Sequence, residues 1–228
     1  MEQDFSVPWT VLDNWIGVAL LILIDVVLLV IVSLKPAHQL AQSAGIVLAE
    51  LAYLLPVVAI FAWKRISWKY VRFSKFNSLA LGLGCGLLVG AYLLVLLHNV
   101  ILVALGVDTQ GQEILDLFNQ LDSPGWFIFM GAIFAPLVEE IFFRGFLFQG
   151  FRQKYGWKIG IVLSSFVFAA AHLDPVAFIP TFVLGAALAY LYHRSNSIWP
   201  GVILHFSVNA VGLLGAYLAT QFPSLIPL

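Results

Sequence analysis

The sequence predicts an all-α integral membrane protein, folded as a single bundle of about seven transmembrane helices. Of its 228 residues, 61% are hydrophobic and 10% are charged, whereas a soluble domain has about 25% charged residues. Its mean hydropathy is +0.98, and seven apolar stretches approach the roughly 20 residues that a helix needs to cross a bilayer. The net charge of −1, without a basic run, argues against a nucleic-acid partner.

The predicted spans follow one another with short connections, which leave no room for a separate soluble domain. They run approximately over residues 14–34, 41–63, 78–105, 125–151, 157–173, 175–193 and 198–219. We expect one membrane domain over 1–228, with three spans in 1–106 and a four-span core in 125–219. The acidic N-terminus lacks the positive region of a secretory signal, so the first apolar stretch is expected to remain as a helix.

Tryptophan and basic residues indicate where the membrane surfaces lie. Tryptophan concentrates at membrane interfaces, and each of the seven tryptophans lies at the end of a predicted span or just outside one: Trp9, Trp15, Trp63, Trp68, Trp126, Trp157 and Trp199. Lys and Arg mark the cytoplasmic side, and three loops on one side carry Lys64, Arg65, Lys69, Arg72, Lys75, Arg152, Lys154, Lys158 and Arg194. The opposite loop, 106–124, is acidic, and only Lys35 breaks the pattern. We therefore predict that the N-terminus lies inside and the C-terminus outside.

Two segments of the N-terminal half have recognisable patterns. Residues 112–121 alternate apolar and polar side chains with helical spacing, which predicts a short helix on the membrane surface. Gly82, Gly86 and Gly90 are spaced by four, which predicts a close approach of another helix.

Glu139, Glu140 and Arg144 place three charges inside an apolar run, where each is expensive and usually functional. Glu140 and Arg144 are four residues apart, so they lie on one helix face and are expected to form an ion pair. Glu139 is rotated by about 100° from Glu140, so it points elsewhere and needs another partner. Pro136 precedes it and is expected to open the backbone near the site.

Three further polar residues, His172, His205 and Asn209, lie in the fifth and seventh predicted spans. His205 and Asn209 are four apart and share a helix face. Counted from the basic side, Glu139 and His172 lie at similar depths, about 20 and 22 Å, and Asn209 lies at about 16 Å. A shared cavity is therefore predicted. Asp25, Glu50 and the His98-Asn99 pair are expected to pair across helices or to line a water path.

A carboxylate, two imidazoles and an amide around a wet pocket favour hydrolysis. Glu139 is the expected general base, and His172 is expected to hold the same water. His205 and Asn209 are expected to donate to the oxyanion, with Glu140 and Arg144 in support. We expect no cofactor. The alternative is Zn²⁺ on Glu139, His172 and His205, although the H-E-x-x-H spacing of zinc proteases is absent.

Together these motifs resemble the CAAX-protease and bacteriocin-processing (CPBP, or Abi) membrane family. The family pattern E-E-x-x-x-R, F-x-x-x-H and H-x-x-x-N is matched at Glu139, Glu140 and Arg144, at Phe168 and His172, and at His205 and Asn209. The resemblance covers residues 125 to 215 and implies an intramembrane peptidase acting through Glu139, His172, His205 and Asn209. Its members have been described both as metalloproteases and as glutamate-dependent enzymes.

The expected function is hydrolysis of a peptide bond in a membrane-associated, hydrophobic or lipid-anchored peptide, in contact with membrane lipid. Prenylated substrates are not expected, because so compact a chain is more similar to the bacterial members. This resemblance also implies a location in the bacterial cytoplasmic (inner) membrane. The alternatives are a non-catalytic immunity or scaffold protein that keeps the polar cluster for packing, and a proton-coupled transporter. A transporter is disfavoured because spans one to three have no counterpart of the Glu139 cluster.

Overall fold

The computed structural model describes residues 6–33, 39–107, 110–121 and 123–222, and throughout these segments the regular structure is helical. The long elements are α1 (Val11–Ser33), α2 (Gln39–Lys64), α3 (Leu79–Ala104), α7 (Gln149–Ala171), α8 (Phe178–Ser195) and α9 (Trp199–Gln221). The shorter ones are the 3₁₀-helix η1 (Trp68–Val71), α4 (Gln110–Gln120), α5 (Pro124–Phe129), the π-helix η2 (Met130–Phe134), α6 (Ala135–Glu140) and the π-helix η3 (Ile141–Phe148). The predicted all-α membrane bundle is confirmed.

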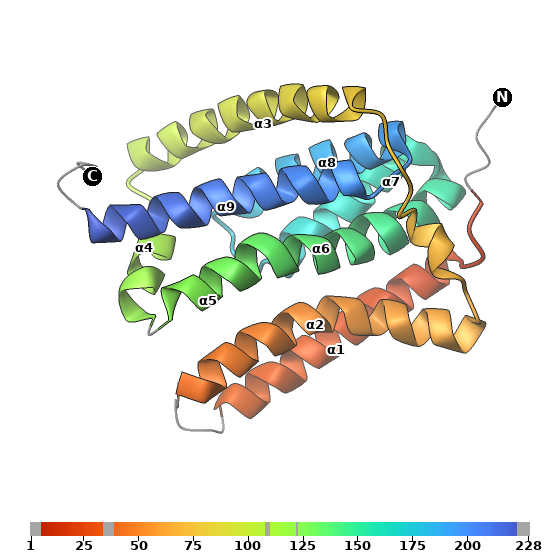
Figure 1. Ribbon diagram of the computed structural model, residues 1–228, viewed down its shortest axis with the longest axis horizontal. Helices are drawn as coiled ribbons and strands as arrows, with labels where there is room; N and C mark the ends of the chain where they lie inside the picture. The colour runs from red at the N-terminus through yellow and green to blue at the C-terminus, as the bar shows by residue number, and fades with distance from the viewer. Residues whose placement is uncertain (1–5, 34–38, 108–109, 122, 223–228) are drawn as a thin grey trace.

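The helices form a layered bundle around α6 and α9 (Figure 1). The pair α1 and α2 packs on the α6 side, and α3 packs on α8 and α9 on the opposite side. Asp13 near the start of α1 forms an ion pair of 2.6 Å with Lys64 at the end of α2. α6 therefore lies inside the bundle, with α2 on one side and α9 on another.

The predicted spans correspond to the observed helices to within about three residues at most ends. Five helical segments among the described residues are long and apolar enough to cross a membrane, and the fourth of them, Pro124–Ala171, covers 48 residues. The sequence predicts two spans there, and the backbone leaves the helical conformation between them at Gly156, where φ is +80° and ψ is 165°. Glycine adopts this left-handed conformation without the steric penalty of a side chain. α8, predicted as a span, is not among the five.

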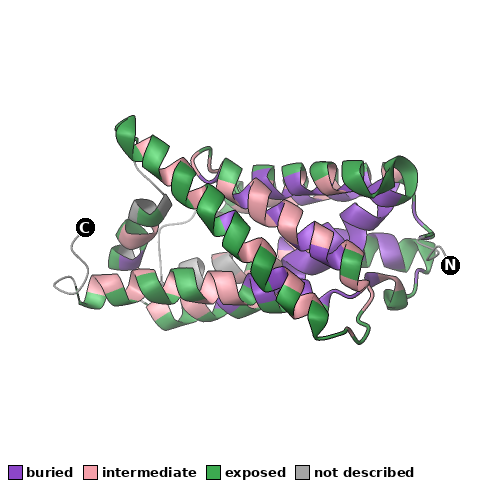
Figure 2. Cartoon of the chain, turned by 90° about the horizontal axis from the view of Figure 1, so that it is seen from above, coloured by how far each residue is buried: buried purple, intermediate pink, exposed green. Residues whose placement is uncertain are grey.

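The tightly packed core lies toward one end of the bundle (Figure 2). Trp9, Phe61, Phe142 and Phe146 are all at most 2% exposed and pack ring against ring, with centroids 5.3 to 6.2 Å apart. Such aromatic contacts are worth about 0.5 to 1.5 kcal/mol beyond the area they bury. They fix η3, the segment that follows Glu139 and Glu140, against α2.

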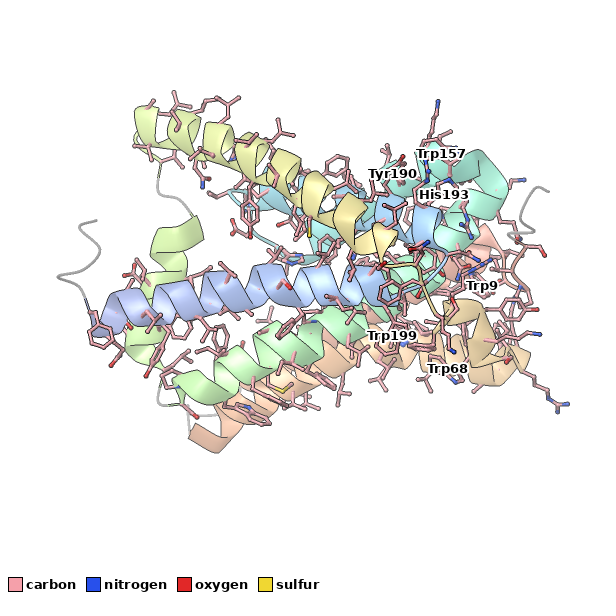
Figure 3. All side chains as sticks on the ribbon, turned by 45° about the horizontal axis from the view of Figure 1, so that its top comes forward. Trp9, Trp68, Trp157, Tyr190, His193 and Trp199 are labelled. Carbon is pink, nitrogen blue, oxygen red and sulfur yellow. The ribbon has the colours of Figure 1, made fainter. Side chains whose placement is uncertain are left out.

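The predicted basic loops meet at this same end. Arg72 after η1 donates to Gln149 at 3.0 Å and to Asn196 beyond α8, and Ser197 donates to the carbonyl of Ser74 at 2.6 Å. Trp9, Trp68, Trp157 and Trp199 also lie at this end (Figure 3). One interface with aromatic and basic residues is therefore present, as predicted. Three further residues of the predicted charge pattern lie outside the described residues: Lys35, Asp108 and Asp122.

The short helix predicted at 112–121 is confirmed as α4, and its position at the membrane surface stays a prediction. Phe118 is 4% exposed and contacts Phe127 of α5 and Tyr217 of α9. The prediction for Gly82, Gly86 and Gly90 is wrong: a Cβ at any of them would meet no atom within 4 Å. The glycine that permits close packing is Gly84, where a Cβ would collide with Leu204 of α9. Gly84 is two residues away from Gly82 and from Gly86, so it lies on a different helix face.

Candidate functional site

The site is built on a stretch of helix with two π turns. Pro136 has no N–H, so it cannot donate to the backbone carbonyl one turn earlier. The N–H of Ala135 donates to Met130 in the η2 turn, and the carbonyl of Gly131 accepts from the side-chain amide of Asn209 on α9, at 2.9 Å. π turns of this kind are frequent at functional sites. The opened backbone predicted at Pro136 is therefore present, and Asn209 ties it to α9.

Glu140 and Arg144 form the predicted ion pair, at 2.6 Å, and both are almost completely buried. Arg144 also donates to the carbonyl of Gly185 on α8 at 3.1 Å, and its guanidinium lies 4.5 Å from the centre of the Phe168 ring. A buried ion pair is favourable only when hydrogen bonds supplement the charge attraction. These contacts join α6, η3, α7 and α8 around Glu140.

His205 lies between the two glutamates. Its Nδ1 is 3.2 Å from Oε1 of Glu140, and its Nε2 is 3.6 Å from Oε2 of Glu139. Glu139 and His205 are 7% and 2% exposed. Within the described part of the chain, Oε2 of Glu139 accepts no hydrogen bond. Glu139 is therefore a buried carboxylate whose nearest described partner is an imidazole and not a fixed cation.

Hydrogen-bond chemistry assigns the donor in one of these two contacts. A carboxylate oxygen accepts hydrogen bonds, so Nδ1 of His205 donates to Oε1 of Glu140. The 3.6 Å between Nε2 of His205 and Oε2 of Glu139 is too long for a hydrogen bond. The imidazole is therefore fixed by Glu140 and lies beside Glu139 without bonding to it.

His172 ends α7 and is exposed. Its Nδ1 is 2.8 Å from the carbonyl of Phe168, and a carbonyl can only accept, so Nδ1 carries the proton. Nε2 of the neutral ring is then the acceptor. The Phe168 ring contacts the imidazoles of both His172 and His205, with centroids 4.8 and 5.7 Å apart. The structure thus brings Glu139, Glu140, Arg144 and His205 together, and Phe168 contacts both His205 and His172.

The alternative zinc ligands do not fit a metal. Among the described residues, no three His, Cys, Asp or Glu side chains lie together closely enough to hold an ion. In the predicted set of Glu139, His172 and His205, Nδ1 of His172 is directed to the carbonyl of Phe168, and both nitrogens of His205 are directed to carboxylates.

Sequence reasoning missed the glycines that the site requires. A Cβ at Gly201 of α9 would lie 2.8 Å from Oε2 of Glu140. Gly185 approaches Phe168 and Ser165 closely and also supplies the carbonyl for Arg144. Gly201 lies four residues before His205, and Gly185 lies in the middle of α8. Neither glycine belongs to a sequence motif that would indicate a close contact. His98, by contrast, contacts its neighbour Asn99 at 3.4 Å on α3, apart from the cluster.

Gly201→Ala is expected to lower the free energy of unfolding by about 1 to 3 kcal/mol, because α9 must move away from Glu140. Gly212→Ala on the same helix is the matched control, since its Cβ would meet nothing within 4 Å. Unfolding of both variants in mixed detergent micelles, followed by tryptophan fluorescence, compares them. Equal stability of the two variants would contradict the contact between α9 and Glu140.

The fold and site together define a helical integral membrane protein with a buried Glu–Arg–His cluster. Residues 122–211 match the model of one family, described as type II CAAX prenyl endopeptidase Rce1-like. This region contains every predicted site residue and excludes α1, α2 and α3. The resemblance to the CAAX-protease and bacteriocin-processing family is thereby confirmed over this region.

Curated relatives agree with this match. The chain is 24% identical over 104 residues to "Putative membrane peptidase YdiL" of Bacillus subtilis, covering 46% of this chain and 43% of the relative. It is 33% identical over 87 residues to an uncharacterized 24.3 kDa protein of Escherichia coli, covering 36% and 40%, and 30% identical over 97 residues to UPF0177 protein YxdF of Lactococcus lactis, covering 42% and 53%. The chain thus spans about half or less of each of these relatives. No solved structure matches it.

Proposed function

We propose that this protein is an intramembrane endopeptidase that hydrolyses a peptide bond in a membrane-associated or hydrophobic peptide, with Glu139 as the general base. The observation that carries the proposal is the state of Glu139, a buried carboxylate beside His205 with an oxygen that accepts no hydrogen bond among the described residues. Its neighbour Glu140, by contrast, is paired with a cation: Oε1 of Glu140 is 2.6 Å from Arg144 and 3.2 Å from Nδ1 of His205. The family match over residues 122–211 supports the same class of reaction.

In the proposed reaction, Glu139 takes a proton from water as the water oxygen attacks the peptide carbonyl carbon. The imidazole of His205, bonded to Glu140, lies 3.6 Å from the Glu139 carboxyl and can take up the proton that Glu139 has accepted. Nε2 of His172 can accept a hydrogen bond, and the side chain is exposed. His172 is therefore suited to bind a water molecule that moves toward Glu139. The side-chain amide of Asn209 donates to the carbonyl of Gly131 and so supports the backbone near Glu139. The predicted oxyanion role of His205 and Asn209 stays a prediction.

We further propose that the basic end of the bundle faces the cytoplasm of a bacterial cell. The start of α1 lies at this end, because the N–H of Val7 donates to Gln153, and α9 runs to the opposite end (Figure 1). In this orientation, the substrate is a hydrophobic or lipid-anchored peptide that lies among the membrane lipids and reaches Glu139 from within the bilayer.

Glu139→Gln tests the function, because it keeps the shape of the side chain and removes the base. Peptide ends are compared in membrane fractions of cells that express the wild type or the variant at equal levels. Ends that appear with the wild type and are lost in Glu139→Gln are the expected result. Identical ends in the two samples would overturn the proposal in favour of a non-catalytic scaffold, and a lost proton-coupled flux with unchanged ends would favour a transporter.

A further inference from the structure

Beyond the matched region, one polar side chain of the N-terminal half faces the site. Glu50 on α2 has a buried oxygen, Oε2, that forms no hydrogen bond within the segments the structure describes. Every other buried glutamate oxygen in this condition belongs to Glu139 or Glu140. A polar atom buried without a partner is costly, about 1 to 3 kcal/mol, so its retention calls for a functional reason.

The packing of α2 on α6 sets the position of Glu50. The two helices run in the same direction side by side (Figure 1). Tyr53 of α2 contacts Phe143 at a centroid distance of 5.6 Å and Phe142 at 6.1 Å. Glu50 lies about one turn before Tyr53, and Glu139 lies about one turn before Phe143. When two parallel helices touch at one pair of residues, the residues one turn earlier on each helix are also neighbours. Glu50 and Glu139 are accordingly close enough to interact electrostatically.

Two neighbouring carboxyl groups in a low-dielectric site cannot both be ionised at low cost, so one of them keeps its proton. Glu139 has the imidazole of His205 beside it, which can stabilise its charge, and Glu50 has no such partner among the described residues. The charged group that acts on Glu50 is Glu139 on α6, and Tyr53 on the same helix as Glu50 is in turn acted on by Glu50, Glu139 and Asp25 of α1. None of these groups is a cation, so Glu50 is the carboxyl group of the pair that is suited to hold the proton.

We propose that Glu50 is a second catalytic carboxyl, the general acid that protonates the leaving nitrogen opposite the base Glu139. Pairs of carboxyl groups whose surroundings keep one protonated and the other ionised divide these two roles in hydrolytic enzymes. This inference rests on the proposed peptidase function and assigns a role to the N-terminal helices, which the family match does not cover.

The proposed hydrolysis forms one bond to the carbonyl carbon and breaks another. The water oxygen forms a bond to the carbonyl carbon, and one water proton passes to Glu139. The C–N bond then breaks, its electron pair remains on nitrogen, and the nitrogen takes the proton of Glu50. Transfer of the proton from Glu139 to Glu50, through water, restores both groups, and the products are a carboxylic acid and an amine.

Glu50→Gln is the test, with Asp25→Asn as a matched carboxyl-to-amide control in the same half. The probe is a quenched fluorescent peptide that contains the most abundant cleavage site lost in Glu139→Gln cells, assayed with full-length protein in detergent micelles. We expect kcat of Glu50→Gln to fall about a hundredfold with KM unchanged. The fall in rate at high pH, where a general acid loses its proton, should also be absent from its pH profile. Asp25→Asn should keep both kcat and profile.

Three outcomes would overturn the inference: a wild-type kcat in Glu50→Gln, a lowered kcat with the high-pH fall retained, or an equal loss in Asp25→Asn. If Glu50→Gln does not reach the membrane, Glu50→Asp decides, with a kcat at least about tenfold lower expected and a wild-type rate contradicting the role. Failure here is distinct from failure of the proposed function: Glu139→Gln is then inactive while Glu50→Gln is active.

Discussion

Arg144→Met is expected to lower the free energy of unfolding by about 3 to 5 kcal/mol, the largest stability effect among the substitutions considered. Arg144 is 1% exposed and is the cation that balances Glu140. Removing one partner of a buried ion pair leaves the other charge buried without compensation. The carbonyl of Gly185 also loses its donor. Reversible unfolding in mixed detergent micelles measures the change.

The double variant Glu140→Gln, Arg144→Met separates charge from packing. Glutamine keeps an oxygen that can accept from Nδ1 of His205, and no uncompensated charge remains on the pair. Most of the lost stability should therefore return, since neutral replacement of a whole buried pair is often tolerated. A double variant as unstable as Arg144→Met would show that the contacts of Arg144 with Phe168 and Gly185, and not the charge balance, determine stability.

His205→Gln is expected to reduce kcat by a factor of about 10² to 10⁴. Glutamine can still donate to Glu140, but its amide cannot take up a proton from Glu139 as an imidazole can. The substitution therefore acts on the reactive state of Glu139 and spares the Glu140–Arg144 pair. Cleavage of the fluorescent peptide by purified protein, with the amount in the membrane matched to wild type, gives the ratio.

His98→Gln is the control for this substitution, because His98 lies on α3 and contacts Asn99 and not the glutamates. It should keep the wild-type rate. A His205→Gln protein with unchanged kcat would mean that the contact between Nε2 and Glu139 has no part in the reaction.

Several features could be predicted from the sequence because each depends on local spacing or composition. The ion pair of Glu140 with Arg144 follows from a separation of four residues on one helix. The ends of the spans follow from tryptophan and basic residues at interfaces. By contrast, the motif of His205 and Asn209 predicts a common target, yet the two side chains bind Glu140 and Gly131. These partners lie on another helix, and the sequence does not encode the register between the helices.

The sequence by itself determined that this is a membrane bundle, where its helices begin and end, and which residues carry charge within the apolar runs. Hydropathy and helical periodicity act over a few residues, so they can be read without coordinates. Only the tertiary structure decided that His205 lies between two glutamates and that Asn209 binds the carbonyl of Gly131, whose α-helical donor, the N–H of Ala135, is directed to Met130. It also decided that Glu50 of α2 comes close enough to Glu139 to interact with it electrostatically. These contacts join segments far apart in the chain, and their geometry depends on how whole helices pack.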